Sequence, residues 1–209
     1  MKTITEKNAL ELLKKQFRQY RPGWEKDIVC HAILVRNLSS FIGEKLIDNG
    51  YKVDMKFLRT ACILHDIGYA TAKEKIKHGV CGARCLRSLD LEKYANAAER
   101  HIGIGISAKD SFNLGLGAKD YVPKTIEEII LSYADNLDFF DKRTRIHTIR
   151  GSDAVCERFG KELGKEYKRK TEKFNKKIED MVGARGMAEF RKFVKDYNKK
   201  LKSGSELKL

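Results

Sequence analysis

The chain contains little proline, an odd number of cysteines and no long apolar run. Its 209 residues include 2 prolines and 16 glycines, which excludes collagen-like and low-complexity proteins. No uncharged apolar run approaches the ~18 residues of a membrane-spanning helix. The N-terminus also lacks the apolar centre of a secretion signal. These absences predict a cytoplasmic protein that does not associate with a membrane.

Several common catalytic and cofactor motifs are also missing. The five cysteines lie among helix-patterned apolar residues, which is typical of reduced, buried thiols. Cys81 and Cys85 are one helical turn apart, but no second cysteine pair completes a zinc site. The glycines between 103 and 117 form no dinucleotide-binding motif after a strand, and no Walker lysine appears. The chemistry must therefore come from other residues.

Charge, by contrast, is abundant and unevenly distributed. Charged residues make up 34% of the chain and hydrophobic residues 42%, which is enough for a core at this length. The formal net charge is +14. Residues 142–209 hold 21 lysines and arginines against 10 acidic residues, whereas residues 1–141 hold 22 against 19. The basic excess therefore belongs to the C-terminal third.

Apolar residues recur at helical spacing along the chain, and no convincing period-2 strand appears. Capping boxes at 3–6 and 125–128, together with an N-cap at Asp54, mark expected helix starts. We expect an all-α fold, with a helical bundle in residues 1–150 and basic amphipathic helices in residues 151–209.

The C-terminal segment is predicted to form two of these amphipathic helices. One runs from about residue 152 to 182, and the other carries Met187 to Leu201, with glycines between them. The apolar stripe from Val155 to Met181 predicts packing either within the chain or on a second copy of it. A homo-oligomer therefore stays open.

The five histidines are the most informative residues. His65 and Asp66 fall at the C-terminal end of a predicted helix, where their side chains can turn toward a common point. His31 lies on an apolar helical stripe. Asp135 is flanked by apolar residues, where an unpaired carboxylate needs a cation or a donor. Imidazole and carboxylate together suit Mn, Fe, Co, Ni or Zn, although a single histidine on an apolar face is usually structural.

The order of His31, His65-Asp66 and Asp135 on successive helical segments resembles the HD-domain metal-dependent phosphohydrolase superfamily. Leu64 to Gly68 matches the HDIG form of its signature, and blocks at 78–86 and 100–103 resemble the following ones. The similarity covers residues 25–141, and uncharacterised archaeal HDIG proteins look nearest. The resemblance implies an HD-domain helical bundle that hydrolyses a phosphomonoester or phosphodiester. The implied substrate is a nucleotide or a related compound.

Carried over residue by residue, the pattern implies six metal ligands. They are His31, His65, Asp66, Asp135, His78 and His101. The first four resemble the ligands of the primary metal, Asp66 is positioned to bridge to a second metal, and the last two resemble ligands of that second metal.

Three departures from the family pattern leave the number of ions, one or two, and the general acid open. Ile102 stands where many dinuclear members have a second histidine, and Tyr69 stands where many relatives carry lysine. In addition, no glutamate follows the HD pair closely enough to match the general acid of some mononuclear nucleotidases.

The resemblance also implies a mechanism in which Asp66 and His65 are the catalytic pair. A divalent metal lowers the pKa of bound water from ~15.7 toward ~7, and the resulting hydroxide attacks phosphorus in line. Asp66 is expected to orient or deprotonate this water. Basic residues near the site are candidates to hold the other phosphate oxygens, although each is more often part of a solvated surface. These candidates are Lys73, Lys75, Lys77, Arg100 and Arg145.

The basic C-terminal segment supports a second function class, a nucleic-acid-binding module built on the HD fold. Five aromatic residues alternate there with lysine and arginine. They are Tyr167, Phe174, Phe190, Phe193 and Tyr197. The same aromatics fall at core spacing, so RNA or DNA stays an open partner beside the phosphate-ester substrate. A degenerate HD protein that only binds a metal or nucleotide is disfavoured by the intact ligand set.

Overall fold

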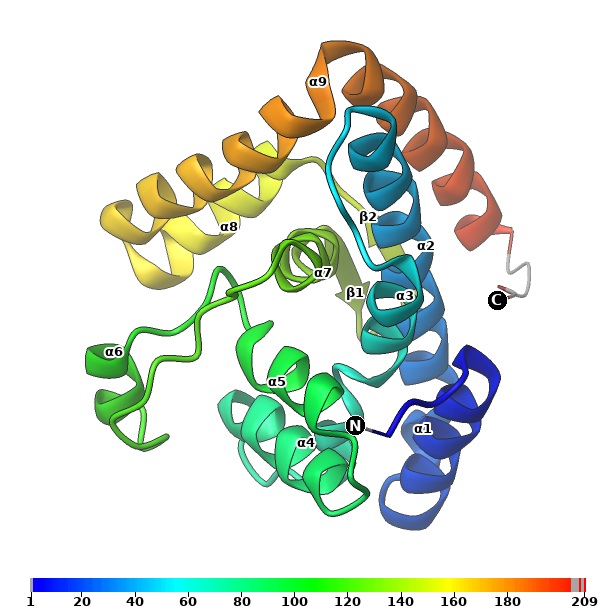
Figure 1. The fold of residues 1–209 in the computed structure, drawn as a ribbon, viewed down its shortest axis with the longest axis vertical. Helices are drawn as coiled ribbons and strands as arrows, with labels where there is room; N and C mark the ends of the chain where they lie inside the picture. Colours follow the sequence, from blue (N-terminus) through cyan, green and yellow to red (C-terminus); the bar gives the residue numbers. More distant parts are fainter. Residues whose placement is uncertain (1, 204–206, 208) are drawn as a thin grey trace.

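Helices account for most of the chain in the computed structural model, which describes residues 2–203, 207 and 209 (Figure 1). The helices are α1 (Glu6–Tyr20), α2 (Glu25–Asp48), α3 (Met55–Leu64), α4 (His78–Arg87), α5 (Glu92–Arg100), α6 (Ala108–Asn113), α7 (Ile126–Asn136), α8 (Ser152–Leu163) and α9 (Lys165–Lys202). Short 3₁₀ turns η1 (Pro22–Trp24), η2 (Ile67–Ala70) and η3 (Lys75–Lys77) connect some of them. The expected helical fold is confirmed.

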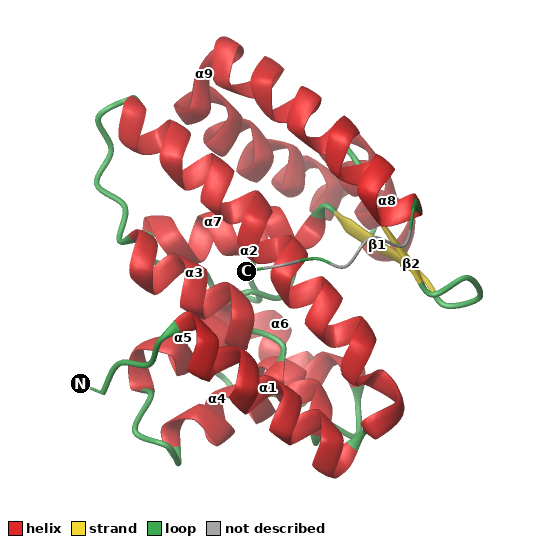
Figure 2. Cartoon of the chain, turned by 90° about the vertical axis from the view of Figure 1, so that its right-hand side faces the viewer, coloured by secondary structure: helices red, strands yellow, loops and turns green. Residues whose placement is uncertain are grey.

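A small antiparallel hairpin interrupts the helices, which differs from the strand-free sequence prediction. Strands β1 (Asp138–Asp141) and β2 (Ile146–Ile149) pair with Asp138 opposite Ile149 and Asp141 opposite Ile146. The hairpin extends from one side of the molecule (Figure 2). Each strand has four residues, which is too short for an alternating pattern to be recognised.

Side-chain caps define several helix starts. The Asp54 carboxylate accepts a hydrogen bond from the Phe57 amide, and Thr125 with Glu128 forms a capping box at α7, as predicted. At the first helix the prediction of a box at 3–6 is wrong, because Thr5 is the N-cap and accepts from the Asn8 amide. Both threonines precede the same apolar stripe, so the pattern alone does not separate them.

The C-terminal helices differ most from the predicted boundaries. The expected helix from 152 to 182 breaks at Gly164, whose φ of 92° only glycine adopts easily, so that α8 folds back along the first half of α9 (Figure 1). A second break, at Gly183, is confirmed as a kink with φ 77°. Beyond it, α9 runs beside α2.

One buried cluster joins the C-terminal helices to the rest of the chain. Val155 and Ile178 are fully buried in it together with Leu34 and Leu38 of α2. Most of the apolar stripe of 155–181 is therefore covered within the chain, with Leu163 exposed, and it gives no support to self-association. The division at residue 150 stays a prediction. No helix in the described part of the chain has the length and apolarity needed to cross a membrane.

Gly68 places the turn after α3 directly against α4. A Cβ atom at this position would overlap the carbonyl oxygen of His78 and the amide nitrogen of Gly82. Only a residue without a side chain permits this backbone approach. The glycine of the HDIG motif thus brings the His65-Asp66 pair next to the first residue of α4, which is His78.

Candidate metal centre

The six predicted metal ligands converge from the ends of different helices. His31 comes from the second turn of α2, His65 and Asp66 follow α3, and His78 begins α4. His101 follows α5, and Asp135 lies in the last turn of α7. The structure therefore brings together side chains separated by more than 100 residues. Because α3, α5 and α7 point their C-terminal ends, and hence their partial negative charge, toward this point, the backbone itself favours a cation there.

Three of the imidazoles are oriented in the same way. The Nδ1 atoms of His65, His78 and His101 lie 2.7, 2.5 and 2.7 Å from the backbone carbonyl oxygens three residues earlier. A carbonyl oxygen only accepts hydrogen bonds, so Nδ1 carries the proton in each ring and the neutral ring presents an unprotonated Nε2. At His65 and His101 these contacts also satisfy carbonyls near the C-terminal ends of α3 and α5, where the helix leaves them without partners.

The first group of ligand atoms surrounds the Nε2 atom of His31. It lies 3.0 Å from Nε2 of His65, 3.1 Å from Oδ1 of Asp135 and 3.3 Å from Oδ2 of Asp66. His65 Nε2 is in turn 3.5 Å from Asp135 Oδ1. Two imidazole nitrogens and two carboxylate oxygens, all with lone pairs, thus face one another with too few hydrogen atoms between them to form hydrogen bonds. This arrangement is stable only around a proton or a cation.

The second group lies on the other oxygen of Asp66. Its Oδ1 atom is 3.2 Å from Nε2 of both His78 and His101, and these two nitrogens are 2.9 Å apart. Oδ1 is buried and has no hydrogen bond of acceptable geometry among the described residues. Asp66 therefore offers one oxygen to each group, which fits a carboxylate that bridges two metal ions.

The electrostatics of the centre favour positive charge. Burial opposes ionisation of Asp66 and Asp135, yet the surrounding imidazoles hold the pKa of both carboxyls below its ordinary value. Burial alone would lower the pKa of His31 and His65, but the carboxylates outweigh it and raise both. At His101 burial prevails and the pKa is lowered. The donor set and its charge thus fit a divalent transition metal.

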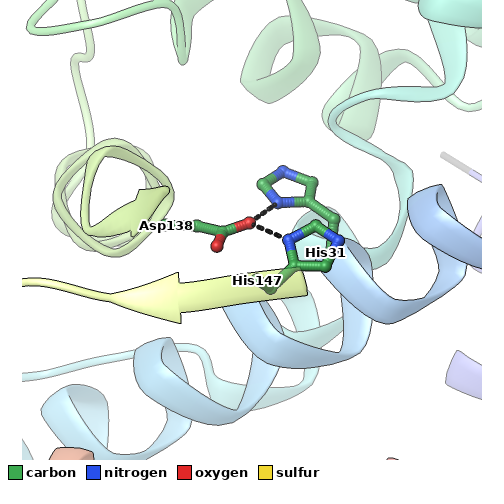
Figure 3. A group of neighbouring side chains, drawn as sticks. All are labelled: His31, Asp138 and His147. Carbon is green, nitrogen blue, oxygen red and sulfur yellow. Dashed lines mark hydrogen bonds and ion pairs between the residues drawn. The ribbon is translucent and has the colours of Figure 1, made fainter. Parts of the chain in front are cut away.

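Two residues that the sequence interpretation missed support His31. Oδ2 of Asp138 lies 2.7 Å from Nδ1 of His31 and 2.6 Å from Nδ1 of His147 (Figure 3). His147 is buried, with only 6% of it exposed. Asp138 follows Asp135 by three residues, so the sequence carries a local signal for a second carboxylate near the site. His147 has no such signal, because only the hairpin brings it to Asp138.

A cleft with a volume of about 1500 Å³ opens onto the centre. His31, Asp66 and Asp135 lie at its wall, and the hairpin, α8 and the start of α9 form other parts of the lining. Aromatic side chains also line it, among them Trp24, which is 45% exposed. The volume exceeds the ~300–1,000 Å³ typical of small-molecule sites.

The predicted phosphate-binding residues divide into two sets. Lys73 and Lys75 are exposed and line the cleft. Three others lie outside its lining and pair with carboxylates. These pairs are Lys77 with Glu74 at 2.6 Å, Arg100 with Glu128 at 2.9 Å and Arg145 with Asp27 at 2.6 Å. Of the five candidates, the structure thus brings two to the cleft.

Sequence comparison assigns the family. The model of the HD domain matches residues 28–139, more than half of the chain and the stretch that carries the six ligands. The chain belongs to the HD-domain family. HD domains bind divalent metals, in agreement with the His/Asp clusters described above.

Relatives of this HD-domain protein include an uncharacterised protein of Methanocaldococcus jannaschii, 41% identical over 143 residues that cover 68% of this chain and 80% of the relative. A tRNA (cytidine(56)-2'-O)-methyltransferase of Thermoplasma volcanium is 32% identical over 75% of this chain, which spans 45% of that enzyme's length. Among solved structures, the HD domain of the L. monocytogenes phosphodiesterase PgpH matches 82% of this chain and 95% of that one, with 17% identity and a TM-score of 0.48.

Proposed function

We propose that this HD domain binds two divalent transition-metal ions and hydrolyses a phosphate ester. One observation carries the proposal: four imidazole nitrogens and three carboxylate oxygens face one another at 2.9–3.6 Å. His31, His65 and Asp135 would hold one ion, His78 and His101 the other, and Asp66 both. Mn, Fe, Co, Ni and Zn all suit these ligands.

The bound ions would supply Lewis acidity and an acidic water at neutral pH. The chain's own residues contribute position and charge. Asp66, between the two groups of ligands, is placed to orient the attacking water and to accept its proton. Asp138 fixes the ring of His31 through Nδ1. Lys73 and Lys75 supply positive charge at the cleft wall for the phosphate oxygens.

A nucleotide phosphomonoester or phosphodiester is the proposed substrate. The lining of the cleft combines carboxylate and imidazole groups with aromatic and basic side chains. Aromatic rings such as Trp24 and Phe140 provide surfaces on which a base can stack. We also propose that residues 1–150 form the HD unit and that residues 151–209 form an extension lining one side of the cleft.

Product formation tests the proposal, measured as released phosphate for phosphomonoesters and as the ring-opened monophosphate for cyclic phosphates. Nucleoside mono-, di- and cyclic phosphates are supplied with Mn, Co, Ni or Fe(II), and wild type is compared with Asp66→Ala and with Asp48→Ala as an exposed control. We expect turnover in wild type and the control only, with two ions per wild-type chain by elemental analysis. Normal hydrolysis by folded Asp66→Ala would refute the site.

A second candidate function, binding of RNA, is favoured by the methyltransferase relative. The five C-terminal aromatics named above pack against the core, so base stacking would have to use other rings. RNA binding would then depend on the positive charge of exposed residues of α9, such as Arg191, Lys192 and Lys195. Their replacement by alanine should reduce salt-dependent retention on RNA. Unchanged retention would reject this role, and deletion of 152–209 is unsuitable because it removes core residues.

A further inference from the structure

Two arginines outside the family match face the cleft without an acidic partner. Arg150 follows the hairpin and Arg158 lies on α8, and both line the cleft. Within the described part of the chain, neither has a carboxylate at ion-pair distance, in contrast to Lys77, Arg100 and Arg145. The chain has a net charge of +14, so many of its cations lack an acidic partner. The position of these two guanidinium groups at the cleft is what makes them candidates to bind another anion.

Arg158 is held in a fixed orientation. Its guanidinium carbon lies 4.5 Å from the ring centre of Phe139 and 4.7 Å from that of Phe159. Arg150 lies 4.3 Å from the same Phe139 ring. Contact with aromatic rings restrains the plane of a guanidinium group. A restrained guanidinium group loses less entropy when its N–H groups bind two oxygens of one phosphate.

The hydrogen-bonding capacity of Arg158 is largely unused. Its one hydrogen bond within the described residues joins Nη2 to the Asn136 carbonyl oxygen at the long distance of 3.4 Å. Its Nε atom is buried and has no partner there. A desolvated, unpaired donor on a charged group is costly, and an anion with several acceptor oxygens would remove that cost.

The position of these arginines links them to the proposed reaction. Asn136 follows the ligand Asp135, and Phe139 follows Asp138, so Arg158 contacts the neighbours of two residues of the metal centre. Lys73 and Lys75 approach the cleft from a different segment, between η2 and α4. The cleft therefore has basic groups at two separate places, and its volume of about 1500 Å³ gives room for more than one nucleotide.

We propose that Arg158, assisted by Arg150, forms a second phosphate-binding subsite that holds a phosphate group other than the one that reacts. This inference rests on the proposed phosphohydrolase function and narrows its substrate class to compounds with at least two separated phosphate groups, as in a dinucleotide. It also gives the C-terminal extension a direct role in substrate binding.

The test compares the affinity for UMP with that for the dinucleotide pUpU, which carries one more phosphate. Trp24, the single tryptophan, lines the cleft and reports binding by its fluorescence. Stopped-flow mixing with the metal-loaded protein reads binding before turnover. We expect wild type to favour pUpU, and Arg158→Met to reduce this preference about 10- to 100-fold. Arg158→Lys should restore part of it, and Arg150→Met should lower it less.

Lys161→Met is the matched control, because Lys161 is an exposed cation on the same helix outside the cleft lining. An equal loss of preference in Lys161→Met, or an unchanged preference in folded Arg158→Met and Arg150→Met, would overturn the subsite. Thermal melts establish that each variant is folded. A preference that depends on Arg158 in a protein without any turnover would support the subsite while rejecting the hydrolase function. Turnover in a protein whose preference for pUpU does not depend on Arg158 would support the hydrolase function and reject the subsite.

Discussion

Replacement of Asp138 by asparagine tests whether this residue holds the metal centre in place. Its Oδ2 atom accepts hydrogen bonds from Nδ1 of both His31 and His147, at 2.7 and 2.6 Å, and its side chain is only 3% exposed. Burial raises the pKa of Asp138, but the two imidazoles outweigh it and lower the pKa, so the group is a carboxylate at neutral pH. The substitution keeps the shape and removes the charge.

The expected loss is in metal affinity. A carboxylate that accepts from Nδ1 fixes the tautomer of a ligating imidazole and makes its Nε2 more basic, and removing such a partner typically weakens metal binding 10- to 100-fold. This factor corresponds to about 1.4–2.7 kcal/mol. An asparagine oxygen in the place of Oδ2 can still accept both hydrogen bonds, but it carries no charge. The ring of His31 therefore keeps its orientation but loses the carboxylate that makes its Nε2 atom more basic.

Competition with a chromophoric chelator for Co(II) or Zn(II) measures this affinity without any substrate. Asp141→Asn provides the control, because Asp141 lies on the same strand, is exposed and bonds the backbone of Arg143 instead. We expect the control to bind as wild type does. A folded Asp138→Asn protein whose dissociation constants stay within twofold of wild type would show that Asp138 does not support the centre.

Three further predictions concern metal binding and stability. Asp66→Ala should lose both ions in elemental analysis, since the carboxylate faces both groups of ligands; retention of two ions would contradict the bridging role. Gly68→Ala should lower the unfolding free energy by about 3 kcal/mol through backbone overlap, whereas Gly23→Ala, which has open space around it, should not. Glu99→Gln should cost about 1–3 kcal/mol at pH 7. Arg87 and Lys119, despite burial, lower the pKa of Glu99. This cost should therefore decline in denaturation curves as pH falls below the unfolded-state pKa of ~4.3 and be lost once pH passes below the lower folded-state pKa; a cost that stays constant throughout the acid range would refute it.

The sequence predicts the metal centre better than the cleft around it. His65, Asp66 and Gly68 lie in one short motif, and the other candidate ligands follow in a fixed order, so a resemblance in order predicts them without knowledge of the fold. Gly68 illustrates why the motif is local: its lack of a side chain lets η2 contact α4 directly. A constraint of this kind determines the residue type at a single position, so it can be recognised in the sequence.

The residues that line the cleft depend on long-range packing, which no short pattern records. His147 reaches Asp138 because the hairpin turns back after Asp141. Arg158 of α8 reaches Phe139 and the carbonyl oxygen of Asn136 at the C-terminal end of α7. The basic residues nearest the HD motif in sequence were the natural candidates, yet Lys77 pairs with Glu74 one turn away. Arg100 pairs with Glu128, which the fold brings to it from 28 residues away.

The basic excess of the C-terminal third therefore contributes in two different ways. Most of its cations are exposed, and some of them, such as Lys170 and Lys176, pair with acidic residues one helical turn away, where solvent and salt screen them. Their joint field can draw a polyanionic substrate toward the protein, but it selects no particular group. Arg158 is partly buried, oriented by two rings and without an acidic partner in the described chain. Selectivity for a second phosphate should consequently depend on this one arginine far more than on the number of surface lysines.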